Sequence, residues 1–174
     1  MLVIDDRENQ KLIHELLLVM GDASQEEKGQ AVVKRLPSAD YVMGDCGIEA
    51  KEINDLYKSI MGIGRTRNIT AQLVDLQNSY ENPMLVVYGT KLKPYFKYRP
   101  TAQQVNKEIA KMKKVIQTFK ATFYQKFGKI KYMEVISMDD FVEWLVVNHT
   151  QDGMALSNHH PDVIHSVKKF DMDP

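Results

Sequence analysis

The distribution of apolar and polar residues along the chain predicts a mixed sheet packed between helices. Six short segments are expected to be strands, over residues 2–5, 31–36, 41–45, 48–51, 84–88 and 131–136. Apolar residues at helical spacing predict helices over residues 8–20, 52–61, 68–80, 101–127 and 138–148. The resulting order, β-α-β-β-β-α-α-β-α-β-α, is typical of an α/β domain with a mixed central sheet and helices on both faces.

The length of 174 residues suits one domain with a tail. We expect the domain to span residues 1–150 and a polar C-terminal extension to follow over residues 151–174. The first four residues are apolar and acids follow at once, which is not the pattern of a signal peptide. No apolar run is long enough to cross a membrane, and the single cysteine, Cys46, excludes an internal disulfide. These features favour an intracellular protein, cytoplasmic or nucleoid-associated (in the host cytoplasm if the source is viral), without a membrane partner.

The charge is balanced overall but unevenly distributed. The sequence has 23 Lys and Arg residues and 23 Asp and Glu residues, so its formal net charge is zero. Between Lys91 and Lys131, however, twelve residues are basic and only Glu108 is acidic. The rest of the chain is therefore strongly acidic. The net charge of zero therefore does not exclude nucleic-acid binding, because the positive field of the basic segment can attract phosphates whatever the charge of the whole chain is.

The most informative stretch is Gly44–Asp55, with the sequence GDCGIEAKEIND. Cys46-Gly47 is expected to form a tight hairpin turn that brings Asp45 beside Glu49 and Lys51, which share one face of the next strand. Carboxylate oxygens are the ligands that Mg²⁺ or Mn²⁺ requires, and a lysine beside them can orient water and stabilise an anionic transition state. The triplet thus fits metal-dependent phosphodiester hydrolysis. By itself it fits a solvated edge hairpin with a Lys–Glu pair better.

The residues around this triplet form an ordered series. The sequence carries IDDRE at 4–8, GD at 44–45, IEAKEIND at 48–55, GR at 64–65 with Gln72 downstream, and MLVVYG at 84–89. This series resembles the XPF-type family of structure-specific DNA endonucleases over roughly residues 1–150. The resemblance implies a restriction-endonuclease-like fold, an Mg²⁺ or Mn²⁺ cofactor, and cleavage of branched, flap or junction DNA in repair, replication or recombination.

Site residues follow from the resemblance position by position. It assigns metal binding to Asp5, Asp45, Glu49 and the backbone carbonyl of Ala50. It assigns catalytic roles to Lys51 and Arg7 together with the acids Asp5, Asp45 and Glu49. Supporting roles fall to Glu8 and Asp55, and Arg65 and Gln72 are expected beside the site, in contact with DNA. Ala50 departs from the family pattern, which has arginine there. Its side chain is expected on the face opposite Glu49 and Lys51, so the metal site should survive.

Two basic segments are candidate DNA contacts. The loop of residues 91–100, KLKPYFKYRP, mixes aromatic rings with cations, which suits stacking on unpaired bases beside phosphate contacts. The cations of this loop are Lys91, Lys93, Lys97 and Arg99. The long helix adds a stripe of Lys107, Lys111 and Lys114 that could follow a DNA backbone. The alternatives are a surface loop with packed aromatics and an ordinary solvated helix face.

The family usually joins its nuclease domain to a helix-hairpin-helix module, and residues 151–174 are too few to form one. A stand-alone nuclease domain would take its DNA affinity from itself or from a partner chain. The resemblance implies a homodimer or heterodimer through the C-terminal helices, with branched or partly single-stranded DNA as the substrate. Two alternatives to a structure-specific endonuclease stay open. One is a non-catalytic DNA-binding scaffold subunit, and the other is a resolvase- or restriction-like nuclease on the same fold.

Overall fold

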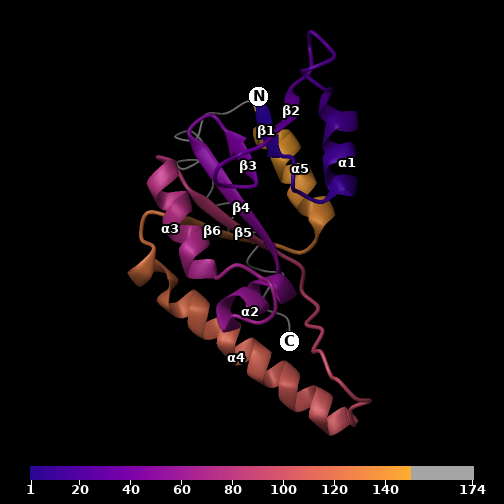
Figure 1. The fold of residues 1–174 in the computed structure, drawn as a ribbon, viewed down its shortest axis with the longest axis vertical. Helices are drawn as coiled ribbons and strands as arrows, with labels where there is room; N and C mark the ends of the chain where they lie inside the picture. Colours follow the sequence, from indigo (N-terminus) through magenta and orange to yellow (C-terminus); the bar gives the residue numbers. More distant parts are fainter. Residues whose placement is uncertain (150–174) are drawn as a thin grey trace.

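The structure, a computed structural model, describes residues 1–149. The predicted C-terminal extension, residues 151–174, lies outside the described residues. Within residues 1–149 the elements are β1 (Leu2–Asp5), α1 (Gln10–Met20), β2 (Ala31–Lys34), β3 (Tyr41–Met43), β4 (Cys46–Glu52), α2 (Ile53–Met61), α3 (Ile69–Ser79), β5 (Met84–Tyr88), α4 (Ala102–Lys126), β6 (Lys131–Val135) and α5 (Met138–Asn148) (Figure 1). The predicted order of elements is confirmed.

The six strands form one mixed sheet in the order β2-β1-β3-β4-β5-β6. β1 and β2 are parallel, β3 is antiparallel to both β1 and β4, and β4, β5 and β6 are parallel to one another. The central register pairs Tyr41 with Ile48 across the β3–β4 hairpin and Lys51 with Val87 across β4 and β5. This mixed topology confirms the predicted fold class.

Helices cover both faces of the sheet (Figure 1). On one face, α1 and α5 pack over a core that includes Leu16 and Phe141. On the other, α2, α3 and α4 cover a core that includes Leu73 and Phe123. Side chains of β4 alternate between the two, so Ile48 and Ala50 face the α1–α5 side and Glu49 and Lys51 face the α2–α4 side. The expectation that Ala50 points away from Glu49 and Lys51 is thus confirmed.

The hairpin turn differs from the sequence-based prediction. The turn residues are Gly44 and Asp45, and Cys46-Gly47 already belong to β4. Gly44 has φ 57°, a left-handed conformation that glycine adopts without steric cost, whereas Gly47 lies in the strand under the ring of Tyr80. A Cβ atom at Gly47 would come within 2.2 Å of that ring. The sequence-based prediction placed the turn at Cys46-Gly47, two residues after its position in the structure. It therefore also predicted the wrong register between β3 and β4.

Candidate active site

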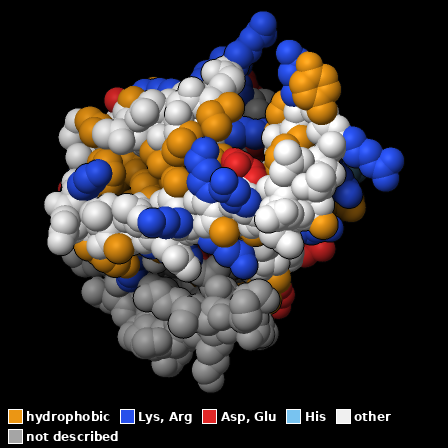
Figure 2. Space-filling view, turned by 90° about the horizontal axis from the view of Figure 1, so that it is seen from below, with side chains coloured by type: hydrophobic (Ala, Val, Ile, Leu, Met, Phe, Trp, Pro, Cys, Tyr) orange, Lys and Arg blue, Asp and Glu red, His pale blue; other side chains and the backbone are white. Residues whose placement is uncertain are grey.

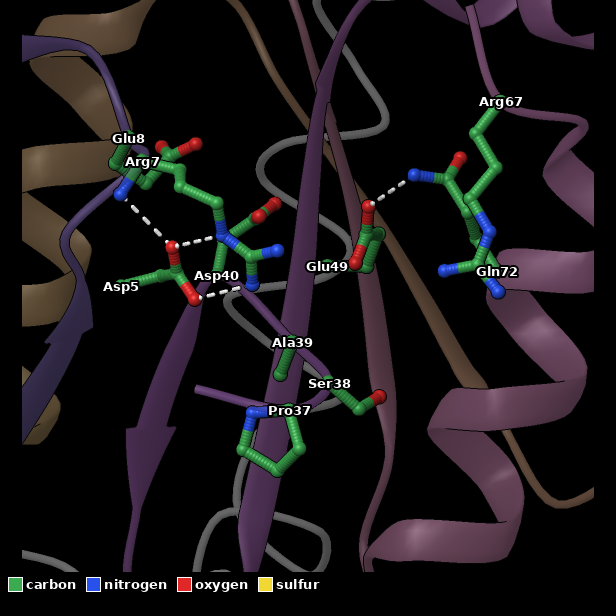
Figure 3. A pocket seen from close by; sticks show the side chains of 10 residues that line it. All are labelled: Asp5, Arg7, Glu8, Pro37, Ser38, Ala39, Asp40, Glu49, Arg67 and Gln72. Atoms are coloured by element: carbon green, nitrogen blue, oxygen red, sulfur yellow. Dashed lines mark hydrogen bonds and ion pairs between the residues drawn. The ribbon is translucent and has the colours of Figure 1, made fainter. Parts of the chain in front are cut away.

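A pocket opens where β1, the segment before β3, β4 and α3 meet (Figure 3). Its lining combines carboxylates with two arginines and an amide. The residues around it are Asp5, Arg7, Glu8, Pro37, Ser38, Ala39, Asp40, Glu49, Arg67 and Gln72. Five of them, Asp5, Arg7, Glu8, Glu49 and Gln72, are predicted site residues that the fold does bring together. Asp40 is not among the predicted residues.

Asp40 is held at the start of β3 by the sheet itself. Its backbone N–H donates to the Ile48 carbonyl (2.8 Å) and its carbonyl accepts from the Asp5 N–H (2.8 Å). Its carboxylate accepts from the Ala50 N–H at 2.9 Å. With a two-residue turn at 44–45, the residue that precedes Tyr41 necessarily lies across from Glu49. Asp40 and Glu49 are therefore neighbours because of the hairpin register.

Asp45, the acid predicted to join Glu49 and Lys51, does not reach the pocket. It lies in the β3–β4 turn, where its carboxylate accepts a hydrogen bond from the Asn82 side chain at 2.8 Å. Glu49 lies four positions further along the chain, which corresponds to about 13 Å at the usual rise per strand residue. The prediction was wrong because it placed the turn two residues too late.

Glu49 is a buried carboxylate, 7% exposed, on the α3 side of β4. Gln72 on α3 donates its side-chain N–H to Glu49 at 3.0 Å, as Figure 3 shows. Burial raises the pKa of Glu49, and the charge of Glu8 raises it further against the opposing effect of Lys51. Gln72 thus lies beside the site, as expected, and holds this acid. Its expected contact with DNA stays a prediction.

Glu8 approaches the pocket from the turn before α1. Its carboxylate accepts a hydrogen bond of 2.6 Å from the Tyr41 hydroxyl. Burial raises the pKa of Glu8, and the Tyr41 hydrogen bond partly offsets that rise. Burial also holds the pKa of Asp40 well above its usual range, with added repulsion from Glu49 and Glu8. Burial is thus the largest cause that raises the pKa of all three acids, and charge repulsion from neighbouring carboxylates adds to it. A bound cation would favour their charged forms.

Asp5 has a different environment from these three acids. Its two oxygens accept four hydrogen bonds, from the backbone N–H, Nε and Nη2 of Arg7 and from the Leu36 N–H, at 2.7 to 3.0 Å. The Arg7 side chain lowers the pKa of Asp5 to about 2. Arg7 also donates to the Leu36 carbonyl at 2.6 Å. Through these bonds Asp5 braces the segment before β3 by way of Arg7. That Asp5 binds metal stays a prediction.

The remaining predicted residues divide between the pocket and its surroundings. Lys51, two residues after Glu49 on the same face of β4, is half-buried and lies outside the pocket lining. Asp55 is exposed in the first turn of α2. Arg65 is exposed and does not line the pocket; Arg67 does, and it is paired with Asp75 on α3. The arginine of this segment that lines the pocket is therefore Arg67, two residues after the predicted Arg65.

A family model for the ERCC4 domain matches residues 4–147 of the chain. The chain belongs to the ERCC4 domain family. The resemblance seen in the sequence motifs is thereby confirmed. The match ends one residue before the end of α5 and so includes every helix that the structure describes and nearly all of its strand residues.

Two solved structures have the same fold as this ERCC4 domain. One is XPF from Aeropyrum pernix, with a TM-score of 0.59 and 18% sequence identity, which covers 97% of this chain and 69% of that chain. The second is XPF from Aeropyrum pernix in complex with DNA, with a TM-score of 0.57, 20% identity, and coverage of 93% and 68%. No curated protein matches the sequence. Within residues 1–149, none of the helices has the length and apolar character needed to cross a membrane.

The donor set of this ERCC4 domain suits a hard divalent cation. Among residues 1–149 no group of three Asp, Glu, His or Cys side chains is arranged to hold an ion. Mg²⁺, however, usually takes one or two carboxylates and completes its shell with water. Asp40 and Glu49 supply two carboxylates. The Ala50 carbonyl belongs to the same residue whose N–H donates to Asp40. These three groups match the chemistry of such a site.

Proposed function

We propose that this ERCC4 domain is a divalent-metal-dependent endonuclease that hydrolyses phosphodiesters in branched, flap or junction DNA. The observation that supports the proposal most is the pairing of Asp40 with Glu49 in a pocket where burial raises both carboxyl pKa values. Buried acids in that state favour a cation as partner. Membership of the ERCC4 domain family and the fold shared with XPF agree with it.

Asp40, Glu49 and the Ala50 carbonyl are the proposed ligands of Mg²⁺ or Mn²⁺. When bound, the ion supplies Lewis-acid polarisation of the scissile phosphate. Ala39 has φ 74°, a left-handed conformation that glycine adopts far more readily than alanine. The Gly-Asp of the family pattern would then correspond to Ala39-Asp40 in place of Gly44-Asp45. This assignment agrees with the pocket, whereas Gly44-Asp45 lies away from it.

The neighbouring side chains have separable roles. Lys51 projects from β4 beside Glu49, and its ammonium would balance negative charge that develops on the phosphate. Gln72 fixes the orientation of Glu49 through the 3.0 Å hydrogen bond. Glu8, held by Tyr41, is the third acid at the pocket and is placed to accept a proton from water at the start of hydrolysis. Arg67, exposed at the rim, offers a guanidinium to an adjacent phosphate.

The test is a cleavage assay on a panel of labelled DNAs: plain duplex, fork, flap and four-way junction, each with Mg²⁺, Mn²⁺ or chelator. The proposal expects cleavage of at least one branched substrate in metal and none in chelator. Glu49→Gln keeps an oxygen for the Gln72 N–H and should lower the rate by at least about 100-fold, in the range that loss of one electrostatic catalytic group usually gives. If the wild-type protein binds these DNAs but cuts none of them, the endonuclease proposal is rejected and the non-catalytic scaffold alternative is favoured.

A further inference from the structure

The segment that joins β5 to α4 has an alternating arrangement of exposed and half-buried residues. From Lys91 to Lys97, the odd-numbered residues are exposed and the even-numbered ones are half-buried. The exposed ones are Lys91, Lys93, Tyr95 and Lys97. Such alternation is that of an extended chain lying on the protein surface, with side chains on the outer side about 6.6 Å apart. The outer row therefore presents three cations and one aromatic ring in a line.

The start of this segment is fixed to the domain. The Asn54 side chain donates to the Lys91 carbonyl at 2.9 Å and accepts from the Lys93 N–H at 2.8 Å. Leu92, between them, packs against the core under α2, α3 and α4. A surface row that is held at its base in this way is preorganised, which reduces the conformational entropy lost on binding.

Two of the three aromatic rings in the segment, those of Tyr95 and Tyr98, are mostly in water, whereas Phe96 is half-buried. Tyr95 is 87% exposed and Tyr98 is 79% exposed. A cation contact in this segment places the Lys97 ammonium 5.9 Å from the centroid of the Tyr98 ring. Tyrosine rings left in water next to cations are typical of surfaces on which nucleic-acid bases stack while the cations contact phosphates.

The charge of this region is uncompensated. Among residues 1–149, none of the ion pairs uses Lys91, Lys93, Lys97 or Arg99. Figure 2 views the molecule from the side of this segment, α2 and α4. On the coloured part of that face, Lys and Arg side chains outnumber Asp and Glu side chains, and hydrophobic side chains lie between them. The unpaired cations favour a polyanion as the partner, and the exposed tyrosine rings favour a polyanion with unpaired bases that can stack on them.

The segment also leaves the sheet next to the proposed catalytic residues. Lys51 on β4 pairs with Val87 on β5, and Glu52 pairs with Tyr88, the last residue of β5. Asn54, which holds Lys91 and Lys93, follows Lys51 by three residues. A DNA strand bound along the exposed side chains of residues 91–97 would thus start near the end of β4 that carries Glu49 and Lys51 and would lead away from it.

We propose that residues 91–99 form a track for an unpaired DNA strand, with phosphates on the lysines and bases stacked on Tyr95 and Tyr98. The proposal rests on the proposed function, because the bound strand is the single-stranded arm of the branched DNA that the site would cut. It adds that this arm is recognised by a defined segment of the domain, separate from the acidic pocket.

The experiment measures binding of the full 174-residue chain to a fluorescent oligothymidylate and to a plain duplex, by anisotropy in the presence of chelator so that no cleavage occurs. Tyr95→Ala with Tyr98→Ala should weaken oligothymidylate binding roughly ten-fold or more, since each stacked base contributes substantially. Duplex binding should change less than about two-fold, because base faces are hidden in a duplex. The matched control is Tyr124→Ala, an exposed tyrosine (58%) in the same basic region that already packs edge-on against Phe123.

Two further variants separate stacking from a structural effect. Tyr95→Phe should bind the oligothymidylate with the affinity of the wild type, because it keeps the aromatic face. Tyr95→Leu should bind it more weakly, because leucine offers no ring for a base to stack on. Lys91, Lys93 and Lys97 changed together to alanine should reduce the slope of log affinity against log salt by about 2, as expected for three lost phosphate contacts on a single strand.

The outcomes distinguish this track from the cleavage proposal. Tyrosine variants that bind oligothymidylate as tightly as wild type, or a Tyr124→Ala variant that loses binding equally, would overturn the track even if the protein cuts branched DNA. Tyrosine-dependent binding by a protein that cuts no DNA would support the track and reject the nuclease. A Tyr95→Leu variant that binds like Tyr95→Phe would also overturn the track, because stacking would then play no part.

Discussion

The Asp40 carboxylate accepts a hydrogen bond from the Ala50 backbone N–H at 2.9 Å. This bond joins the start of β3 to the middle of β4 and places an acid from one strand beside the edge of the next. Its existence depends on the two-residue turn at Gly44-Asp45, which sets the register of the hairpin. The pairing of Asp40 with Glu49 is therefore a product of strand register.

Metal binding is expected to stabilise the fold through Asp40. Wild-type protein should gain about 5–11 °C in melting temperature with Mn²⁺ at a hundred-fold excess over its dissociation constant, measured by differential scanning fluorimetry. Asp40→Asn keeps an oxygen for the Ala50 N–H but removes the charge, so its shift should disappear. Asp45→Asn, at the turn, should retain the full shift. Equal shifts in both variants would show that the ion binds elsewhere.

The Asp5–Arg7 pair predicts a specific acid sensitivity. The pKa of Asp5 is lowered from 3.8 to about 2 in the folded protein, so its contribution to stability is complete above about pH 4 and is lost as the pH falls toward 2. Asp5→Asn should therefore be destabilised near neutral pH, by roughly 2 kcal/mol for a hydrogen bond to a charged group. Urea unfolding at several pH values should show wild type and variant converging between about pH 4 and pH 2. A constant difference would refute the assignment.

Gly47 is expected to tolerate no side chain because the Tyr80 ring lies directly over it. Gly47→Ala should reduce the free energy of unfolding by about 1–3 kcal/mol, the usual cost of overpacking. Tyr80 also donates its hydroxyl to the Ser38 carbonyl at 2.8 Å, so moving the ring disturbs the pocket rim. In the double variant with Tyr80→Ala the two losses should be clearly less than additive. Additive losses in denaturant titrations would show that the ring is not what excludes a side chain.

Cys46 should be unreactive in the folded protein. Burial raises the pKa of its thiol to about 12, with the charge of Asp45 adding to the effect. Only a minute fraction of thiolate is present at about pH 8, and the thiolate is the nucleophile. Labelling with iodoacetamide should be negligible until denaturant is added and then complete. Fast labelling of the native protein would mean that the β3–β4 hairpin opens readily.

The fold was largely predictable from the sequence because each element has a local signal. Met84–Tyr88 is apolar throughout, as expected for a central parallel strand, and Thr101 with Gln104 forms a capping box that starts α4. Glu49 and Lys51 were placed on one face by strand alternation alone. These properties depend on residues close together in the chain.

The rest of the site depended on contacts that no local pattern encodes. Either Gly44 or Gly47 could have formed the hairpin turn, and the local sequence does not show that Gly47 packs under the ring of Tyr80, a residue distant in the sequence. Because the turn was predicted at Gly47, Asp45 was expected beside Glu49, where the structure has Asp40. Similarly, Asp5 has the sequence position of a metal ligand, but its oxygens are taken by Arg7 and by Leu36 on a distant segment. The positive φ at residue 39 was likewise invisible, because alanine gives no hint of it.

Asp40, and not Asp45, is the acid that we propose to act with Glu49 in DNA hydrolysis. The most direct test compares single-turnover cleavage of the best branched substrate by wild type, Asp40→Asn and Asp45→Asn in Mn²⁺. We expect Asp45→Asn to cut at close to the wild-type rate and Asp40→Asn to be slower by at least about 100-fold. Asp40→Asn cutting as fast as wild type, or Asp45→Asn losing activity to the same extent, would contradict the proposal.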